Sequence, residues 1–202
     1  LREAEWYLCA KDKLKPCIME PYLYEITPGY SEMMTSLVVP IVKSGKFVGV
    51  TGADITLPVF QKLTEELSKA LYDGKAKVTL LSHLGLIVGT SHYKEKLGRP
   101  LKEAVSDKSY ESYKALKGTQ GIDKQGAEIM VSYPIEIKLA DVKWMLLIEV
   151  PAELAFEGPI QLTAGMSEAA KELGVIILIT GAVIAVLAFV VMKLVVGSVV
   201  AP

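Results

Sequence analysis

The carboxylate of Asp54 lies where a charged side chain needs a physical reason. It falls near the end of KFVGVTGADI (46–55), a run rich in Val and Gly that predicts a strand. A carboxylate on such a strand is exposed to water, paired with donors or cations, or part of a binding site. Two tyrosines, Tyr22 and Tyr24, stand upstream in CIMEPYLYEITPG (17–29). Asp54 is therefore the first candidate for a ligand-binding side chain.

The other reactive side chains do not form a catalytic or metal-binding pattern. His83 and His92 are separated from both cysteines and have no acidic cluster beside them, so we interpret them as hairpin and loop residues. The sequence contains no nucleophile elbow and no P-loop, and the glycines of GKFVGVTG (45–52) lie within a strand instead of a phosphate-binding turn. We expect no enzymatic activity, no cofactor and no metal.

The two cysteines, Cys9 and Cys17, are eight residues apart with Pro16 between them. The chain can turn back at the proline and join them in a disulfide, which an extracytoplasmic setting would favour. We favour the alternative of two unrelated buried thiols.

Composition excludes a nucleic-acid binder, because the net charge is −1 and there is no basic footprint. Hydrophobic periodicity along the chain alternates between the pattern of helices and the pattern of strands. A Ser44-Gly45 turn joins the two strands of the first predicted pair. Pro40 predicts that the first of these strands is irregular or lies near an edge. The predicted elements, in order, are a helix at 5–15, a loop at 17–29, a strand pair at 36–55, a helix at 58–72, a strand pair at 77–90 broken at 83–85, a helical segment at 101–116, a turn region at 118–126, strands at 128–137 and 143–150, and a helix from about 160.

This order predicts an α+β fold of two small units in tandem with antiparallel sheets. LGVIILITGAVIAVLAFVVM (173–192) follows them, twenty residues without a charge or a proline. That length matches a helix crossing a hydrocarbon core of about 30 Å at about 1.5 Å per residue. A buried helix of a soluble core is the alternative, although such helices seldom lack a polar face over this length. One lysine flanks each end, Lys171 and Lys193, so charge does not orient the segment.

Several motifs together resemble the double Cache domain of bacterial chemoreceptors and related sensors. The matching pieces of the first half are WYxxA at 6–10, Pro21-Tyr22 and GVTGADI at 49–55. In the second half they are HLGLIVGTS at 83–91 and YPIEIKLADVKWMLLIEVPAELAF at 133–156. The tail VVGSVVAP is similar to the opening of a HAMP signalling module. In HLGLIVGTS, His83 and Leu84 stand where the family often has an acid and a polar residue.

The resemblance implies tandem PAS-like Cache subdomains followed by one transmembrane helix, with the globular part outside the cell membrane. The family also has a first membrane helix, a long helix and early distal strands, and because the chain does not begin with Met we expect Leu1 to fall within a longer product. The implied divisions are the C-terminal part of the membrane-distal subdomain and linker helix at 1–72, the membrane-proximal subdomain at 73–156, an exit helix at 157–172, the transmembrane helix at 173–192 and the start of a HAMP-like segment at 193–202.

In this family the distal subdomain usually holds the ligand, and Trp6, Tyr7, Tyr22 and Asp54 match positions that line its pocket. The family's amino-acid-binding version has an arginine two residues before the tryptophan, where this chain has Ala4. An acid two residues after the tyrosine of Pro-Tyr is also usual, and this chain has Tyr24 there.

The missing arginine changes the expected ligand. A carboxylate ligand needs a fixed cationic fork or equivalent donors. Aromatic faces with Asp54, helped by Glu20 or Glu25, suit an ammonium group instead. We therefore expect an amine or other cationic small molecule, with an amino acid as the alternative if Arg2 substitutes. The alternative that these aromatic residues are simply part of the hydrophobic core stays open.

The expected function is extracytoplasmic sensing of a small molecule by a chemoreceptor of the bacterial inner membrane. The resemblance implies a homodimer whose span passes the signal to cytoplasmic proteins through an output module outside this chain. The alternatives are the sensor region of a histidine kinase or cyclic-dinucleotide enzyme, and a membrane-anchored assembly protein. A membrane-anchored hydrolase is disfavoured, because no catalytic constellation supports it.

Overall fold

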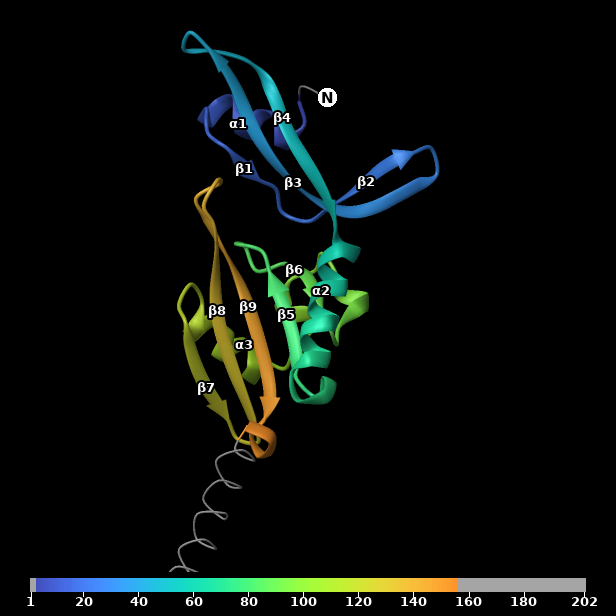
Figure 1. Ribbon diagram of the computed structural model, residues 1–202, viewed down its shortest axis with the longest axis vertical. Coiled ribbons are helices and arrows are strands. Elements are labelled where there is room, and N and C mark those ends of the chain that lie inside the picture. Colours follow the sequence, from blue (N-terminus) through green and yellow to red (C-terminus); the bar gives the residue numbers. More distant parts are fainter. Residues whose placement is uncertain (1–2, 156–202) are drawn as a thin grey trace, which may run out of the picture. The chain divides into compact units, whose positions relative to one another are not determined.

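The computed structural model describes residues 3–155, which fold around two antiparallel sheets (Figure 1). The first sheet uses β1 (Cys17–Ile18), β2 (Tyr22–Thr27), β3 (Tyr30–Lys43) and β4 (Lys46–Thr56). The second uses β5 (Lys77–Leu81), β6 (Ile87–Thr90), β7 (Gly121–Gln125), β8 (Glu128–Ile137) and β9 (Val142–Pro151). The helices are α1 (Glu5–Lys13), α2 (Leu57–Ala70) and α3 (Asp107–Leu116), with short 3-10 turns η1 (Tyr72–Gly74), η2 (Lys94–Lys96) and η3 (Leu101–Glu103). The expectation of an α+β fold with antiparallel sheets is confirmed.

β3 is the central strand of the first sheet. β4 pairs along one edge of β3, and β1 and β2 pair along the other edge. The predicted hairpin at 36–55 is therefore correct, and its turn is at Ser44-Gly45, where both residues have positive φ. Pro40 pairs opposite Val50, and the predicted irregularity is a register shift just beyond it, between Ile41 and Val42.

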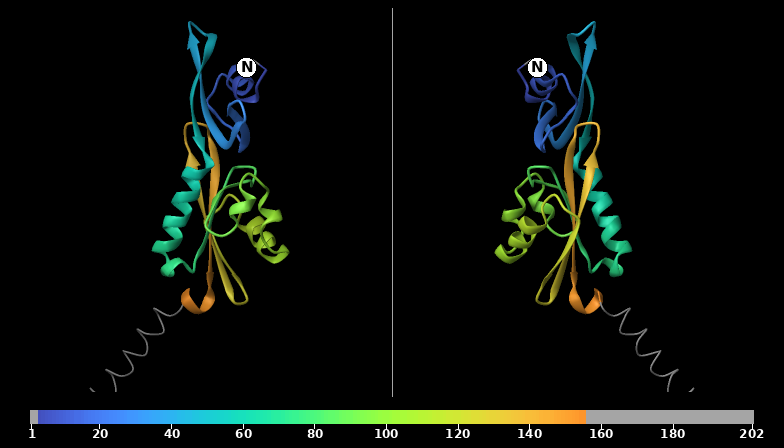
Figure 2. Two further views of the ribbon diagram at one scale, coloured as in Figure 1. Left: turned by 90° about the vertical axis from the view of Figure 1, so that its right-hand side faces the viewer. Right: turned by 90° about the vertical axis from the view of Figure 1, so that its left-hand side faces the viewer.

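The second sheet has the order β6-β5-β9-β8-β7 and is covered on both faces (Figure 2). On one face, α2 packs Leu57 and Phe60 against Leu80, Val88 and Trp144. The rings of Phe60 and Trp144 meet edge to face at 5.5 Å. The backbone of α2 comes so close to β6 that a Cβ on Gly89 would lie 2.7 Å from the Phe60 carbonyl oxygen. Only glycine permits this approach.

The other face of the second sheet carries the larger buried cluster, beneath α3. Its fully buried members include Leu81, Ile87, Leu101, Met145 and Tyr113. Alternation along β5 explains the division, because Leu80 faces α2 and Leu81 faces α3. Because both faces are covered, four of the five residues of β5 and all four residues of β6 are buried.

Three predictions about local structure were wrong. Residues 17–29 contain β1 and β2, and the predicted turn region at 118–126 contains β7. In the first case Pro21 and Pro28 bracket a strand and do not interrupt it, since the β-forming residues YLYEIT lie between them. The cysteines are not free thiols, because Cys9 and Cys17 form a disulfide that ties α1 to β1. A closed loop of this size is expected to add about 2–3 kcal/mol of stability.

Glu20 connects the two sheets. Its carboxylate accepts hydrogen bonds from the Ser82 hydroxyl and, at 3.2 Å, from the Leu84 amide, and its Oε1 lies 2.7 Å from Nδ1 of His83. All three partners lie in the turn between β5 and β6. Residue 19 is also fixed to β3, because its amide donates to the Ser36 carbonyl at 2.9 Å and its carbonyl accepts from Thr35 Oγ1 at 2.6 Å. Residues 19 and 20 thus join β3 to the β5–β6 turn.

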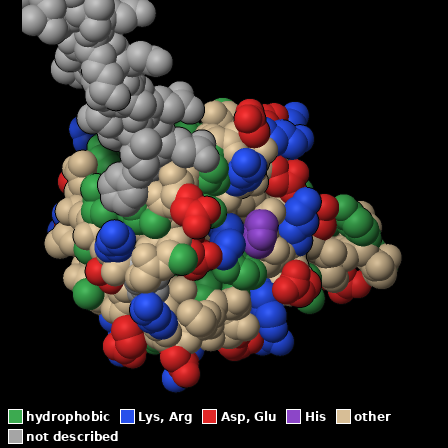
Figure 3. All heavy atoms as spheres, turned by 90° about the horizontal axis from the view of Figure 1, so that it is seen from below, with side chains coloured by type: hydrophobic (Ala, Val, Ile, Leu, Met, Phe, Trp, Pro, Cys, Tyr) green, Lys and Arg blue, Asp and Glu red, His purple; other side chains and the backbone are tan. Residues whose placement is uncertain are grey.

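Some expectations concern segments outside the described residues. Among residues 3–155, no helix is both long enough and apolar enough to cross a bilayer. The predicted exit helix at 157–172, the span at 173–192 and the HAMP-like segment at 193–202 lie outside the described part. On the face drawn in Figure 3, acidic and basic side chains are interspersed, in keeping with the net charge of −1.

Replacing Glu20 by Ala should lower the free energy of unfolding by about 1–3 kcal/mol, because Ser82, 1% exposed, and the Leu84 amide lose their acceptor. Chemical denaturation measures the change. The matched control is Glu66→Ala, which removes only an exposed helix pair with Lys62 and should change stability by about 0.5 kcal/mol or less. Equal losses in the two variants would contradict a structural role for Glu20.

The buried carboxyl group of Glu149 on β9 should make the stability of the fold depend on pH. Its side chain is 7% exposed. Burial, opposed by Lys77 and assisted by Glu128, raises the pKa of the Glu149 carboxyl above its ordinary value. The native state thus holds this proton more tightly than the unfolded chain. Glu149 therefore costs stability as pH rises from the unfolded pKa towards the raised native pKa.

Glu149→Gln should remove this pH-dependent loss of stability, because glutamine does not ionise. The free energy of unfolding of the variant, relative to that of the wild type, should therefore increase as pH rises between the unfolded and native pKa values of Glu149. Urea unfolding at a series of pH values measures it, with Glu66→Gln as an exposed control. An advantage that shrinks as pH rises would show that the sign is wrong.

Candidate functional site

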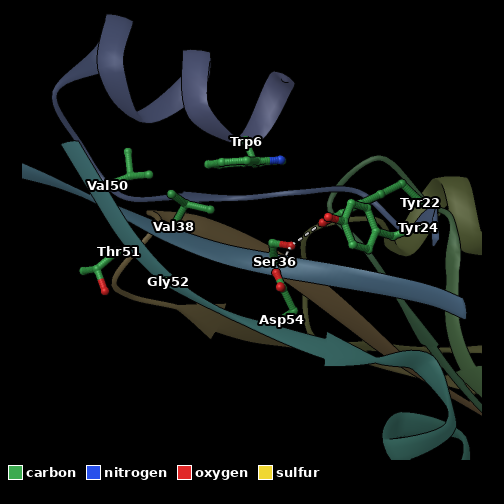
Figure 4. A pocket seen from close by; sticks show the side chains of 9 residues that line it. All are labelled: Trp6, Tyr22, Tyr24, Ser36, Val38, Val50, Thr51, Gly52 and Asp54. Carbon is green, nitrogen blue, oxygen red and sulfur yellow. Dashed lines mark hydrogen bonds between the residues drawn. The ribbon is translucent and has the colours of Figure 1, made fainter. Parts of the chain in front are cut away.

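A cavity of about 280 Å³ lies on the face of the first sheet that α1 covers (Figure 4). The lining residues are Trp6, Tyr22, Tyr24, Ser36, Val38, Val50, Thr51, Gly52 and Asp54.

Strand register explains why these side chains meet. Directly opposite residues of an antiparallel pair point to the same face of a sheet, and residues two apart along a strand share that face. In the β3–β4 pair, Ser36 lies opposite Asp54, and Val38 lies opposite Gly52. Tyr22 lies opposite Met34, two residues before Ser36, so the same face continues from β4 through β3 into β2.

A hydrogen-bonded chain runs across the three strands. The Ser36 hydroxyl donates to Asp54 Oδ1 at 2.6 Å, and the Tyr22 hydroxyl lies 2.6 Å from Ser36 Oγ. A serine has one hydroxyl proton, so once it is given to Asp54 the Tyr22 hydroxyl must be the donor to Ser36. Among residues 3–155 no side chain donates to the second oxygen of the Asp54 carboxylate, so its lone pairs are available to a ligand.

The Tyr22 hydroxyl is neutral at physiological pH. Burial and the nearby Asp54 carboxylate raise the pKa of Tyr22 above its ordinary value. Asp54 therefore faces neutral hydroxyl groups and aromatic rings. It is the one charged side chain among the nine lining residues.

Trp6 reaches this face from α1, and Figure 4 shows its ring lying over the sheet beside Val38. The Cys9–Cys17 disulfide holds the same helix to β1, which pairs with β3 at Val38 and Leu37. The covalent bond thus fixes the helix that carries the cavity's tryptophan. Tyr22 and Tyr24 stand at the other end, with ring centroids 6.3 Å apart.

The structure brings Trp6, Tyr22 and Asp54 together, three of the four positions that the resemblance implied, and adds Tyr24, the other candidate tyrosine. Tyr7 is not among the lining residues. It packs edge to face against Phe47 at 5.5 Å and lies 6.0 Å from Trp6. This position fits a side chain that supports α1 on the sheet.

Sequence reasoning missed five lining residues, namely Ser36, Val38, Val50, Thr51 and Gly52. The period of two along each strand could have indicated Val50 and Gly52, which precede Asp54 on the same face. Ser36 gave a weaker signal, a polar residue at the start of an apolar run. Recognising it required the register between the two strands.

No lysine or arginine lines the cavity within the described part of the chain. Ala4, at the position where a ligand-clamping arginine was sought, precedes the first turn of α1 and offers no charge. Arg2, the proposed substitute, lies outside the described residues. The described site therefore offers aromatic faces, hydroxyls and one carboxylate.

Comparison with known proteins agrees with this architecture. Residues 1–62, which include every residue of the cavity, match the family described as methyl-accepting chemotaxis protein-like, first PDC sensor domain. Over 156 residues the chain is 33% identical to methyl-accepting chemotaxis protein TlpQ of Pseudomonas aeruginosa, covering 76% of this chain and 21% of that protein.

The chain is homologous to the Cache (PDC) sensor region of chemoreceptors. Two solved structures are similar to this chain. One, methyl-accepting chemotaxis protein X, has 30% identity and a TM-score of 0.58, covering 74% of this chain and 55% of that one. The other is the periplasmic sensory domain of the Campylobacter jejuni chemoreceptor Tlp1, with 19% identity and a TM-score of 0.63. The match covers 77% of this chain and 57% of that one. At this identity the similarity supports the fold alone.

The chain thus spans about a fifth of TlpQ and somewhat more than half of each solved domain. Its homologues are sensor domains of chemoreceptors and not enzymes.

Gly52→Ala should damage the site while Gly49→Ala should not. A Cβ on Gly52 would lie 2.5 Å from the Leu37 carbonyl oxygen, whereas nothing lies within 4 Å of one on Gly49. We expect Gly52→Ala to lower the free energy of unfolding by about 1–3 kcal/mol, because the backbones of β3 and β4 must separate. Denaturation of both variants tests this, and similar stabilities would contradict the close approach.

Proposed function

We propose that this chain is the extracytoplasmic sensor of a transmembrane chemoreceptor and binds an amine or other cationic small molecule between Trp6, Tyr22, Tyr24 and Asp54. The observation that carries the proposal is the charge of the lining. Asp54 is its one charged side chain, with a free carboxylate oxygen and aromatic rings around it. This combination attracts an ammonium group by a charge-assisted hydrogen bond and by cation–π contacts.

The Ser36 hydrogen bond supports this reading of Asp54. It holds the carboxylate in one orientation before any ligand arrives, so less conformational entropy is lost on binding. A carboxylate ligand would instead approach Asp54 without a compensating cation among the described lining residues. An amino acid is the alternative ligand, and it requires Arg2 to supply that cation.

We further propose that residues 173–192 cross the membrane and that the receptor signals as a homodimer in the bacterial inner membrane through an output module outside this chain. An uncharged run of twenty residues supports the span. The output would be chemotactic signalling, with a histidine kinase or a cyclic-dinucleotide enzyme as alternatives. A membrane-anchored assembly protein is the alternative that needs no ligand.

We also propose the division into a distal part at 1–72, a proximal part at 73–156, an exit helix at 157–172, the span at 173–192 and the start of a HAMP-like segment at 193–202. Its support is that β1–β4 all precede residue 57, whereas β5–β9 all follow residue 76. Each sheet is therefore built from a continuous stretch of chain.

Isothermal titration of the full chain with propylamine, a linear diamine and choline tests the ligand class, alongside the common L-amino acids. We expect saturable binding of at least one amine. Asp54→Asn should weaken it by about 10- to 100-fold, because a charge-assisted hydrogen bond is lost. Asp12→Asn, an exposed substitution on α1 away from the cavity, should leave binding unchanged.

Binding of amino acids alone would reject the amine and retain a sensor. Binding of neither class, with chemotactic or kinase output unaffected by Asp54→Asn in cells, would favour the assembly protein.

A further inference from the structure

A second cavity, of about 430 Å³, lies in the part of the chain that carries α3 and the β5–β6 turn. Its walls come from three segments far apart in sequence. They are the turn at Leu84 and Gly85, the segment at Pro100 and Leu101, and one face of α3 with the residue after it, at Tyr110, Tyr113, Lys114 and Lys117. The last four residues have the spacing i, i+3, i+4 and i+7, which places them on one helix face.

The Tyr113 hydroxyl is the polar atom in this wall that lacks a partner. The side chain is 3% exposed, and among the described residues its hydroxyl has no hydrogen-bond partner. Burial raises the pKa of Tyr113 to about 12, so the group is a neutral donor at physiological pH. Buried hydroxyl groups in native proteins are nearly always hydrogen-bonded, so an unpaired one needs an explanation.

Gly85 makes room for this hydroxyl at the cavity wall. Gly85 has φ of +92°, and a Cβ there would lie 2.9 Å from the Tyr113 hydroxyl oxygen. Any other residue would therefore be strained in its backbone and would press on the phenol. Because residue 85 is a glycine, no side chain from this turn covers the Tyr113 hydroxyl.

The charged side chains that line the cavity are both cationic. Its charged lining residues are Lys114 and Lys117. Lys114 lies 5.6 Å from the Tyr110 ring centroid and 2.7 Å from Glu111 Oε1, but Glu111 is 68% exposed, so this pair is weak. Among the described residues no carboxylate pairs with Lys117. The negative end of the short α3 dipole opposes an anion here. The Glu20 carboxylate, which accepts a hydrogen bond from the Leu84 amide and acts electrostatically on Tyr113, opposes it as well. Attraction for an anion therefore depends on the two lysines that line the cavity and on the Tyr113 donor.

The remaining walls are apolar. Leu84 is 67% exposed at the edge of the cavity, while Leu101 is 2% exposed at its base. A ligand with a short hydrocarbon body would cover Leu84 and bring its polar end towards the hydroxyl and the lysines.

We infer that this cavity is a second ligand site, which takes a small monocarboxylate. The carboxylate accepts a hydrogen bond from Tyr113 and pairs with Lys117, and the hydrocarbon body rests on Leu84, Pro100 and Leu101. The site is independent of the amine site, since the two cavities share no lining residue.

Isothermal titration of the full chain with sodium propionate tests the site, with propionamide as the neutral analogue and sodium chloride as the ionic-strength control. We expect saturable binding of propionate and none of propionamide. Tyr113→Phe keeps the ring and removes only the hydroxyl, and it should weaken propionate binding by about 10- to 100-fold. Lys117→Gln, an exposed change that leaves the core intact, should weaken it as well.

Two matched controls should bind propionate like the wild type. They are Tyr72→Phe, a tyrosine outside the cavity that is 45% exposed, and Asp54→Asn in the amine site. The inference would be overturned if propionate did not bind saturably. It would also be overturned if Tyr113→Phe and Lys117→Gln bound propionate as well as the wild type does, or if propionamide bound as well as propionate. Loss of amine binding alone would affect only the proposed function.

Discussion

The site depends on one irregularity in the pairing of β3 with β4. At the end of this hairpin Lys43 lies opposite Lys46 and Val42 opposite Phe47, but Ile41 lies opposite Gly49. The extra residue, Val48, shifts the register by one for the remainder of the hairpin. Without it, Ser36 would lie opposite Ala53, and Asp54 would share a face with Thr35. Because a shift of one residue moves every side chain of a strand to the other face, the bulge places Asp54 beside Ser36 in the cavity that Trp6 also lines.

The same strand carries the connection between the two sheets. The Ser36 side chain is bonded to Asp54, while its backbone carbonyl accepts the amide of Met19. Glu20, the next residue, is bonded to the β5–β6 turn. A displacement of β3 on ligand binding would therefore reach the second sheet through two consecutive residues. Spatial continuity of this kind is a necessary condition for coupling, and the strength of coupling is a separate, measurable quantity.

The two cavities differ in charge for a local reason. In the first, strand alternation brings neutral aromatic and hydroxyl side chains around a single carboxylate. In the second, the helix face presents two lysines and a buried phenol. Opposite charges at the two sites would let one chain distinguish cationic from anionic small molecules without a shared binding residue.

Much of the secondary structure was determined by the sequence alone. Alternation and the Ser44-Gly45 turn predicted the first hairpin, and the pattern of PVFQKLTEELSKALY predicted α2 almost residue for residue. The need to account for a carboxylate on a strand singled out Asp54, which lines the cavity of the first sheet. These inferences succeed because they rest on interactions within a few residues. β2 and β7 were missed because prolines or glycines and polar residues dominate their flanks, and a strand is stabilised by its partner.

Tertiary structure decided the rest. The Cys9–Cys17 disulfide depends on where α1 comes to lie against β1, and the position of Tyr7 against Phe47 depends on the same packing. Ser36 joined the site only through the shifted register, which no spacing in the sequence reveals. The Tyr113 hydroxyl and Gly85 are 28 positions apart in the chain and meet only when α3 folds onto the second sheet. Sequence fixes local periodicity and residue chemistry, whereas pairing between distant segments is selected by the free energy of burying both together.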